Sequence, residues 1–117
     1  MTISNQSTKL YSKLEKICNS DREMRKKLGV NRADKLQQRL FELRASETLE
    51  DMARLPAAGC HELSQNRKGQ ISVNLDQPYR LIFVPDHDPL PTTPDGGLDR
   101  KKVTRILVVE IVNYHAK

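Results

Sequence analysis

Tryptophan is absent from this sequence, and aromatic residues of every kind make up only 4% of it. Proteins that bind long single strands of nucleic acid stack successive bases on aromatic side chains, so the composition argues against such a stacking platform. The longest apolar runs have four residues, Leu81–Val84 and Ile106–Val109, whereas a helix that spans a membrane needs about 20. The sequence therefore predicts no membrane-spanning helix.

Cysteine is also scarce, with one residue at position 18 and one at position 60. The N-terminus has no apolar stretch of the kind that directs export, so we expect two reduced thiols in a cytoplasmic protein. The sequence also lacks a phosphate-binding glycine loop, a Cys-x-x-Cys pair and a nucleophile elbow. Asp86-His87-Asp88 looks like part of a metal site, but no matching ligand set follows, so we expect neither a metal ion nor another cofactor.

Acidic residues are fewer than basic ones: 15 Asp and Glu stand against 20 Lys and Arg, which gives a net charge of +5 and an isoelectric point of about 9.4. The excess lies mostly in residues 1–58, which hold twelve basic and eight acidic side chains. This balance favours an anionic partner, either nucleic acid or an acidic protein, although small domains also carry such charge for solubility alone.

The first half of the chain predicts helices. At 117 residues the chain is long enough for one core but not for two, so we expect a single domain over residues 1–117. Ser20 and Glu23 have the spacing of a capping box, which starts a helix that ends at Gly29. Another helix is predicted from Asn31, because apolar residues then recur at spacings of three and four: Ala33, Leu36, Leu40 and Leu43. Its outer face is expected to carry four cations, either as a solvated face, which we favour, or as a surface that binds phosphates: Arg32, Lys35, Arg39 and Arg44.

The second half predicts strands, because apolar and polar residues alternate with a period of two. We expect strands at 71–75, 79–84 and 103–112, a weak edge strand at 6–11, and short helical segments at 12–18 and 47–55. Four of the six prolines fall within residues 85–94, so residues 85–102 are expected to form an exposed loop. The fold class predicted is α+β, with an N-terminal helical pair packed on one face of a small antiparallel β-sheet.

Several side chains of the strand half are suited to binding and cutting an RNA backbone. Histidine titrates near neutral pH and can act as a general acid or base, which makes His61 a candidate. Arg67 and Lys68 stand in a turn and can hold a phosphate. Arg80 stands among apolar neighbours and needs an anionic partner, which is either a carboxylate (Asp76 or Glu110) or a phosphate. Taken one at a time, these residues equally fit a surface histidine, a polar hairpin tip and a structural ion pair.

Read together, the pattern resembles the HigB-type branch of the RelE/ParE toxin superfamily, whose members are often described as plasmid maintenance system killer proteins. Five pieces carry the resemblance: Leu55-Pro56, His61-Glu62-Leu63, Arg67-Lys68-Gly69-Gln70, Pro78-Tyr79-Arg80-Leu81-Ile82-Phe83 and Glu110-Ile111-Val112-Asn113-Tyr114-His115. The resemblance implies helices on an antiparallel sheet, ribosome-associated mRNA cleavage without a metal, and a cognate antitoxin, expected to be of the helix-turn-helix type and to form a hetero-oligomer with the toxin.

The resemblance also implies which residues act. The catalytic positions are His61, Arg80, Tyr114 and His115. Within them the histidines would serve as base and acid, the arginine would stabilise the phosphate, and the tyrosine would orient the substrate. The RNA-binding positions are Arg67, Lys68 and Asn113.

Two departures from the family pattern keep other functions open. The terminal acid of that pattern is Asn113 here, and a Lys-Gly-Asp run before the basic turn is replaced by Ser64-Gln65-Asn66. One alternative is a weakened or inactive homologue that binds only RNA or its antitoxin. Another is a poison of DNA gyrase, as in the ParE branch, which needs no acid–base pair.

Overall fold

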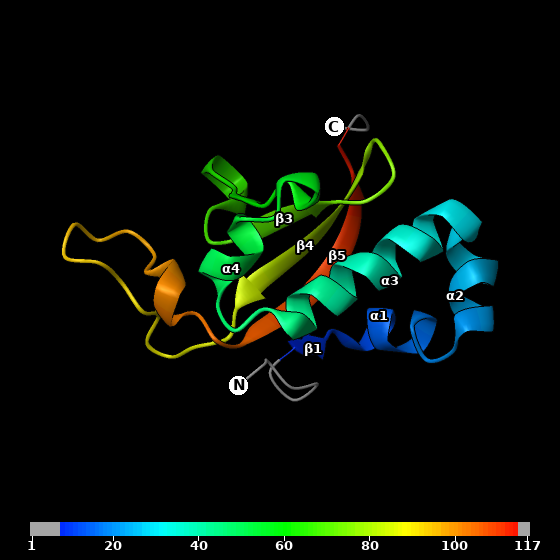
Figure 1. Ribbon diagram of the computed structural model, residues 1–117, viewed down its shortest axis with the longest axis horizontal. Coiled ribbons are helices and arrows are strands. Elements are labelled where there is room, and N and C mark those ends of the chain that lie inside the picture. Colours follow the sequence, from blue (N-terminus) through cyan, green and yellow to red (C-terminus); the bar gives the residue numbers. More distant parts are fainter. Residues whose placement is uncertain (1–7, 115–117) are drawn as a thin grey trace.

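The structure is a computed structural model, and it describes residues 8–114 of the chain. Helical segments dominate the first half and strands the second (Figure 1). The helices are α1 (Ser12–Ile17), α2 (Asp21–Leu28), α3 (Val30–Ala45) and α4 (Leu49–Ala53). The strands are β1 (Thr8–Leu10), β2 (His61–Glu62), β3 (Ile71–Asn74), β4 (Tyr79–Pro85) and β5 (Ile106–Asn113). Three short 3₁₀ turns lie between them: Pro56–Ala58, Gln65–Arg67 and Arg100–Lys102.

The five strands form one sheet in the order β1-β5-β4-β3-β2. Strands β2 to β5 are antiparallel neighbours, whereas β1 pairs with β5 in parallel. The sheet is therefore mixed, and the prediction of a purely antiparallel sheet was wrong at this edge. The α+β class and the helices packed on the sheet are confirmed, and the arrangement is compatible with a RelE-like fold.

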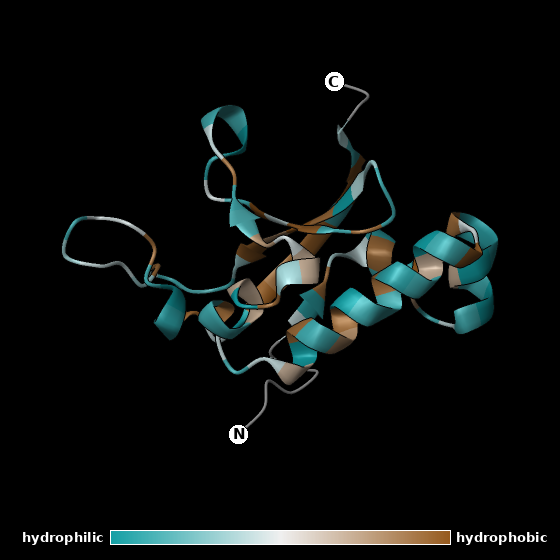
Figure 2. Ribbon diagram, turned by 45° about the horizontal axis from the view of Figure 1, so that its top comes forward, coloured by the Kyte–Doolittle hydropathy of each residue, from teal (hydrophilic) through white to brown (hydrophobic). Residues whose placement is uncertain are grey.

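The core lies between α3 and the sheet, as the two hydrophobic periods predicted. Leu36, Leu40 and Leu43 of α3 are at most 3% exposed. They belong to one buried cluster with the inward residues of the three longer strands, among them Ile71, Val73, Leu81, Phe83, Ile106 and Val108. Figure 2 shows this as hydrophobic colour on the sheet and on the helix sides that face it, with hydrophilic colour outside. The packing fixes α3 behind the sheet and leaves the opposite sheet face free to form a site.

The helix boundaries follow from capping. The Ser20 side chain accepts a hydrogen bond from the Glu23 backbone N–H at 3.1 Å, as predicted, and α2 ends where Gly29 adopts a positive φ of 83°. The same glycine also precedes α3, which therefore begins at Val30, one residue before the predicted Asn31. A single glycine thus makes the sharp turn between two helices, because its backbone enters this region without steric cost.

One predicted surface cation is buried. Arg39 was expected on the solvated face of α3, but it is only 2% exposed. Its guanidinium donates to the carbonyl oxygens of Asn74 at 2.8 Å and Ala57 at 2.9 Å, and it pairs with Glu42 at 3.0 Å. A buried guanidinium is tolerated only when its donors are satisfied in this way. Arg39 therefore ties α3 to the end of β3.

The segment between β4 and β5 is longer than a hairpin turn and holds some order of its own. Thr92 and Leu98 form an isolated antiparallel bridge, and a 3₁₀ turn follows at Arg100–Lys102. Strand β5 begins at Ile106, three residues later than predicted. No helix within residues 8–114 is long and apolar enough to cross a membrane.

The packing of α3 gives a direct stability test. Leu36→Ala should lower the free energy of unfolding by about 2–5 kcal/mol, because the leucine is 1% exposed and truncation leaves a cavity. Urea unfolding followed by circular dichroism measures this. Phe41→Ala on the same helix is the matched control. Its ring is 71% exposed, so a change within about 0.5 kcal/mol is expected, and equal losses in the two variants would contradict the described packing.

Candidate functional site

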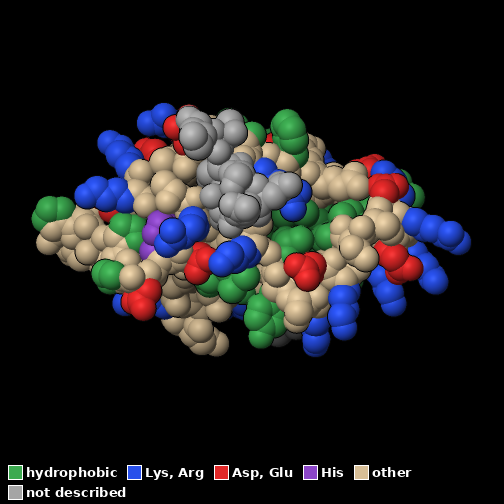
Figure 3. Space-filling model, turned by 90° about the horizontal axis from the view of Figure 1, so that it is seen from below, with side chains coloured by type: hydrophobic (Ala, Val, Ile, Leu, Met, Phe, Trp, Pro, Cys, Tyr) green, Lys and Arg blue, Asp and Glu red, His purple; other side chains and the backbone are tan. Residues whose placement is uncertain are grey.

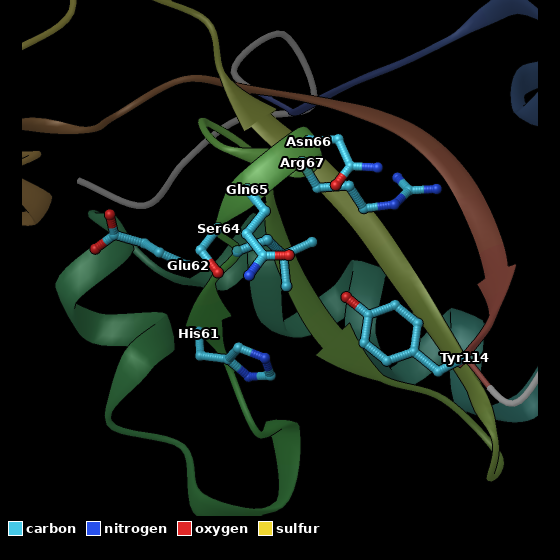
Figure 4. Close-up of a pocket in the computed structure, with 8 residues that line it drawn as sticks. His61, Glu62, Ser64, Gln65, Asn66, Arg67 and Tyr114 are labelled. Carbon is cyan, nitrogen blue, oxygen red and sulfur yellow. The ribbon is translucent and has the colours of Figure 1, made fainter. Parts of the chain in front are cut away.

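A hollow of about 540 Å³ lies on the sheet face that α3 does not cover. Its lining comes from β2, from the turn that follows it, and from the residue after β5: His61, Glu62, Leu63, Ser64, Gln65, Asn66, Arg67 and Tyr114. Figure 4 shows the rings of His61 and Tyr114 facing each other across the hollow, with Arg67 above them and the Glu62 side chain directed away. Three predicted site residues therefore line one cavity.

Arg80 lies next to two residues of this hollow, His61 and Tyr114, and is held by uncharged groups. Its Nε donates to the Ser72 hydroxyl at 2.8 Å, its Nη1 donates to the Asn74 side-chain oxygen, and its Nη2 donates to the Gly59 carbonyl at 2.8 Å. The guanidinium carbon also lies 5.7 Å from the centre of the Tyr114 ring. None of these partners carries a negative charge, so none of them neutralises the guanidinium.

Neither carboxylate considered as a structural partner of Arg80 serves that role. Asp76 pairs with Arg32 at 3.1 Å, and Glu110 pairs with Arg67 at 3.1 Å. Within residues 8–114, no Asp or Glu forms an ion pair with Arg80. Burial lowers the pKa of the Arg80 guanidinium below its ordinary value, although an arginine stays charged at any physiological pH. Among the described residues, Arg80 is therefore a fixed cation without a carboxylate partner.

His61 is exposed and lies beside this cation. Its Nδ1 is 3.2 Å from the Gly59 carbonyl oxygen and 3.4 Å from Arg80 Nη2. Nδ1 donates to the Gly59 carbonyl in one tautomer and accepts from Arg80 in the other, and the first tautomer leaves Nε2 as the proton acceptor. In this tautomer the ring can take up a proton at the atom that faces away from Gly59.

The two cations of the basic turn, Arg67 and Lys68, line different cavities. Arg67 lines the hollow, where it donates to Gln70 at 2.8 Å and pairs with Glu110, so its charge is partly compensated. Lys68 instead lines a second cavity of about 460 Å³, beside the 85–102 segment. The two cations therefore do not form one clamp, because the 3₁₀ turn at Gln65–Arg67 directs them to different sides of the chain.

The C-terminal site residues also divide. Asn113 is in register with Tyr79, and Val112 is in register with Arg80. Because side chains alternate between the two faces of a strand, Asn113 lies on the α3 side of the sheet, opposite to Arg80, while Tyr114 reaches the hollow. His115 lies outside the described residues, so the pair of histidines predicted for acid–base chemistry is placed only in part.

Other reactive side chains have structural roles. His87 accepts at Nε2 from the backbone N–H groups of Thr104 and Arg105, at 3.0 and 3.2 Å, and so joins the two ends of the long loop. Within residues 8–114 no group of three His, Cys, Asp or Glu side chains is placed to hold a metal ion. Both cysteines are free thiols, and burial raises the pKa of the Cys60 thiol to about 11, which keeps it protonated and unreactive at neutral pH.

Sequence reasoning missed the residues that hold Arg80 in place: Gly59, Ser72 and Asn74. The signal was present in part, because Ser72 and Asn74 are the polar members of an alternating strand. On a neighbouring antiparallel strand an arginine at the same face meets such residues across the ladder. The Gly59 carbonyl comes from a loop outside the sheet, and no spacing rule would have found it.

The family is found by comparison with known proteins. A family model described as a RelE-like toxin of the type II toxin–antitoxin system HigB matches residues 10–88. The chain belongs to this HigB-like toxin family. The match includes Arg80, His61 and the residues that hold them, and it ends before β5. No curated protein and no solved structure matches the chain. Membership in a type II toxin family implies an antitoxin partner.

Within this HigB-like domain, Gly59 is the position where a substitution should disturb the site most directly. Its φ is +55°, and a Cβ built there would overlap Asn74 Nδ2 and lie 3.0 Å from Asn74 Cγ. Gly59→Ala should therefore lower the free energy of unfolding by about 1–3 kcal/mol, through backbone strain and displacement of Asn74. Thermal unfolding measures the loss. Gly69 has a positive φ and open space around it, so Gly69→Ala isolates the strain, and an equal loss in both would show that contact with Asn74 contributes nothing.

Proposed function

We propose that this HigB-like chain is a toxin that cuts messenger RNA on the ribosome and so inhibits translation in the cytoplasm. The observation that supports this most is Arg80, a cation that is fixed by three neutral acceptors and lies next to two residues of the hollow, His61 and Tyr114. A group held in this way is ready to receive an anion without rearrangement, which is the condition for stabilising charge that develops in a transition state. Phosphate is the anion that RNA supplies.

The proposed reaction needs only the RNA and groups of the chain. The 2′-hydroxyl oxygen attacks the adjacent phosphorus, and a base removes the hydroxyl proton. The bond from phosphorus to the 5′-oxygen breaks, and an acid protonates the leaving oxygen, so the products carry a 2′,3′-cyclic phosphate and a 5′-hydroxyl. Negative charge grows on the phosphate oxygens during the attack, and Arg80 is placed to stabilise it. His61 and His115 are the proposed base and acid.

The remaining residues of the hollow are proposed to position RNA. The Tyr114 ring faces His61 and lies near the guanidinium, where it can orient the substrate or stack on one base. Arg67 and Lys68 are proposed to contact the RNA around the cut, whereas Asn113, which the sequence also predicted to bind RNA, lies on the opposite face of the sheet. Because Arg67 is paired with Glu110 and Lys68 lies on the neighbouring cavity, their contribution should be smaller than that of Arg80.

The partners follow from the same proposal. The ribosome would present the message, so a small domain without an aromatic platform need not hold long RNA by itself. An antitoxin, proposed to be of the helix-turn-helix type, would form a hetero-oligomer with the toxin and control it. We propose no metal or other cofactor for the reaction.

The cleavage proposal predicts a hierarchy of variants. Arg80→Ala, His61→Ala and His115→Ala should each lower the rate of message cleavage by about 10²–10⁴, because each removes charge stabilisation or acid–base assistance. A translation extract programmed with a defined message, with primer extension to locate cut ends, measures the rate. Arg54→Ala is the control, since that side chain is 69% exposed and follows the last residue of α4. Asn113→Asp should raise the rate if a carboxylate orients His115.

Other results would support one of the two alternative functions, a module that only binds or a gyrase poison. Undetectable cleavage by the unaltered chain and by Asn113→Asp alike would reject the enzyme and favour a module that only binds. Cleavage of supercoiled DNA by gyrase in the presence of the chain, with the message intact, would favour a gyrase poison instead.

Asn74 offers a sharper test of why Arg80 matters. Asn74→Asp keeps the shape of the side chain but places a carboxylate where Arg80 Nη1 now meets an amide oxygen. The new ion pair should neutralise the cation, so cleavage should fall at least tenfold. Loss of the Nδ2 hydrogen bond to the Ala57 carbonyl should lower the free energy of unfolding by only about 1–3 kcal/mol, which leaves the fold intact. Asn74→Ala leaves the charge uncompensated, and its cleavage should exceed that of Asn74→Asp. The reverse order would show that Arg80 acts by position and not by charge.

A further inference from the structure

A third hollow, of about 310 Å³, lies on the helical half of the molecule. It shares no lining residue with the hollow beside Arg80. We call it the helical groove. It runs between α2 and α3 and reaches β1, and its lining residues are Leu10, Cys18, Asp21, Met24, Gln37, Leu40, Phe41 and Arg44. Figure 3 shows hydrophobic side chains gathered in a hollow over the helical half, with Lys and Arg side chains along its edge.

Two features of the helical groove indicate that another molecule binds there. The Phe41 ring is 71% exposed, the largest exposed fraction among the apolar side chains of the described chain. The Nε of Arg44 is buried and has no hydrogen-bond partner among residues 8–114. A buried donor without an acceptor is costly, and an apolar ring at the rim of a hollow is typical of a surface that another chain covers.

No residue of the groove accepts a hydrogen bond from Arg44 Nε in the described structure. Its one carboxylate, Asp21, accepts instead from Gln37 at 2.6 Å and from Arg25 at 2.9 Å. These two bonds lower the pKa of the Asp21 carboxyl, with Gln37 as the larger cause. Arg44 forms no ion pair with the described residues, so a carboxylate of a partner would meet a positive charge there.

The charge of the surrounding helices indicates the kind of partner. Residues 12–45, which span α1 to α3, hold ten Lys and Arg and five Asp and Glu, so this segment accounts for the whole net charge of +5. A second copy of the chain would bring the same positive charge against it, which is unfavourable. The aliphatic floor formed by Leu10, Met24 and Leu40 suits an apolar side chain better than a phosphate backbone.

We propose that the helical groove docks an acidic segment of the antitoxin, with one apolar anchor packed against Phe41 and a carboxylate that accepts from Arg44. The partner class rests on family membership, whereas the site rests on the groove itself. Central, desolvated contacts of this kind carry most of the binding free energy of an interface. Attraction between an acidic segment and the basic helices should also make the association weaken as salt rises.

The test uses the full chain and the protein encoded by the reading frame next to its gene. Calorimetric titration should show Phe41→Glu binding at least about 30-fold more weakly than the unaltered chain, the loss expected of a central contact, and Arg44→Glu at least tenfold more weakly. Leu90→Glu and Arg54→Glu are matched controls, because these side chains are 48% and 69% exposed on other parts of the molecule. Both should bind within threefold of the unaltered chain. Phe41→Ala provides a variant without added charge, and it should bind at least fivefold more weakly.

Message cleavage is measured on the same proteins, and it keeps this proposal separate from the cleavage proposal. Groove variants that bind the neighbouring protein as tightly as the unaltered chain would overturn the docking site and leave the cleavage proposal intact. Groove variants that cleave more slowly while binding normally would overturn it in favour of RNA as the occupant. An unaltered chain that cleaves but forms no complex with the neighbouring protein would also overturn it. Loss of cleavage in the Arg80 variants, with binding unchanged, bears on the cleavage proposal alone.

Discussion

Asn74 is the point through which the helices, the loop and the candidate site of this domain are connected. Its main-chain oxygen accepts from the buried Arg39 of α3, its side-chain oxygen accepts from Arg80, and its side-chain nitrogen donates to the Ala57 carbonyl at 3.3 Å. Ala57 in turn accepts from Arg39. Two guanidinium groups therefore lie on opposite sides of one strand, and each is satisfied through the same residue. Leaving a buried donor without its acceptor costs about 1–3 kcal/mol, so this network fixes the site to α3 and to the loop.

Arg39 and Arg80 differ in whether a carboxylate neutralises their positive charge. Arg39 is 2% exposed and paired with Glu42, so its charge is neutralised within the core. Arg80 has equally good hydrogen-bond geometry but only neutral acceptors among the described residues. Hydrogen bonds to neutral oxygens fix a guanidinium without cancelling its charge, and this is the arrangement that lets a cation act on a ligand. Arg67, on the same face of the sheet, pairs with Glu110, and Arg32, on the α3 face, pairs with Asp76. The absence of a carboxylate at Arg80 among the described residues is therefore a specific feature of the site.

Local patterns predicted the elements, and contacts between distant segments decided what the patterns left open. Ser20 and Glu23 predicted the start of α2 because a cap depends on residues three apart. The parallel pairing of β1 could not be predicted, because a three-residue strand carries too little pattern to give its direction.

Strand β5 contains a bulge that the sequence did not indicate. Phe83 pairs with Val108 and Ile82 pairs with Glu110, so Val109 has no partner. The side chains after Val109 therefore change faces relative to a regular strand. A period-two reading would place Glu110 on the face of Val108, whereas the bulge turns it to the other face, where it reaches Arg67.

The same distinction applies to the site. His61, Arg67, Arg80 and Tyr114 were found from residue type and from the resemblance to HigB-like toxins, and the fold brings them to one face of the sheet. The division of Arg67 from Lys68 depends on a 3₁₀ turn, and the position of Asn113 depends on the register with Tyr79. Neither could be read from spacing along the chain. The spacing of three and four placed Leu40 in the buried stripe and left Phe41 outside it, and the exposures agree. The spacing did not indicate the helical groove, because the hollow that Phe41 borders is formed together with residues of α2 and β1.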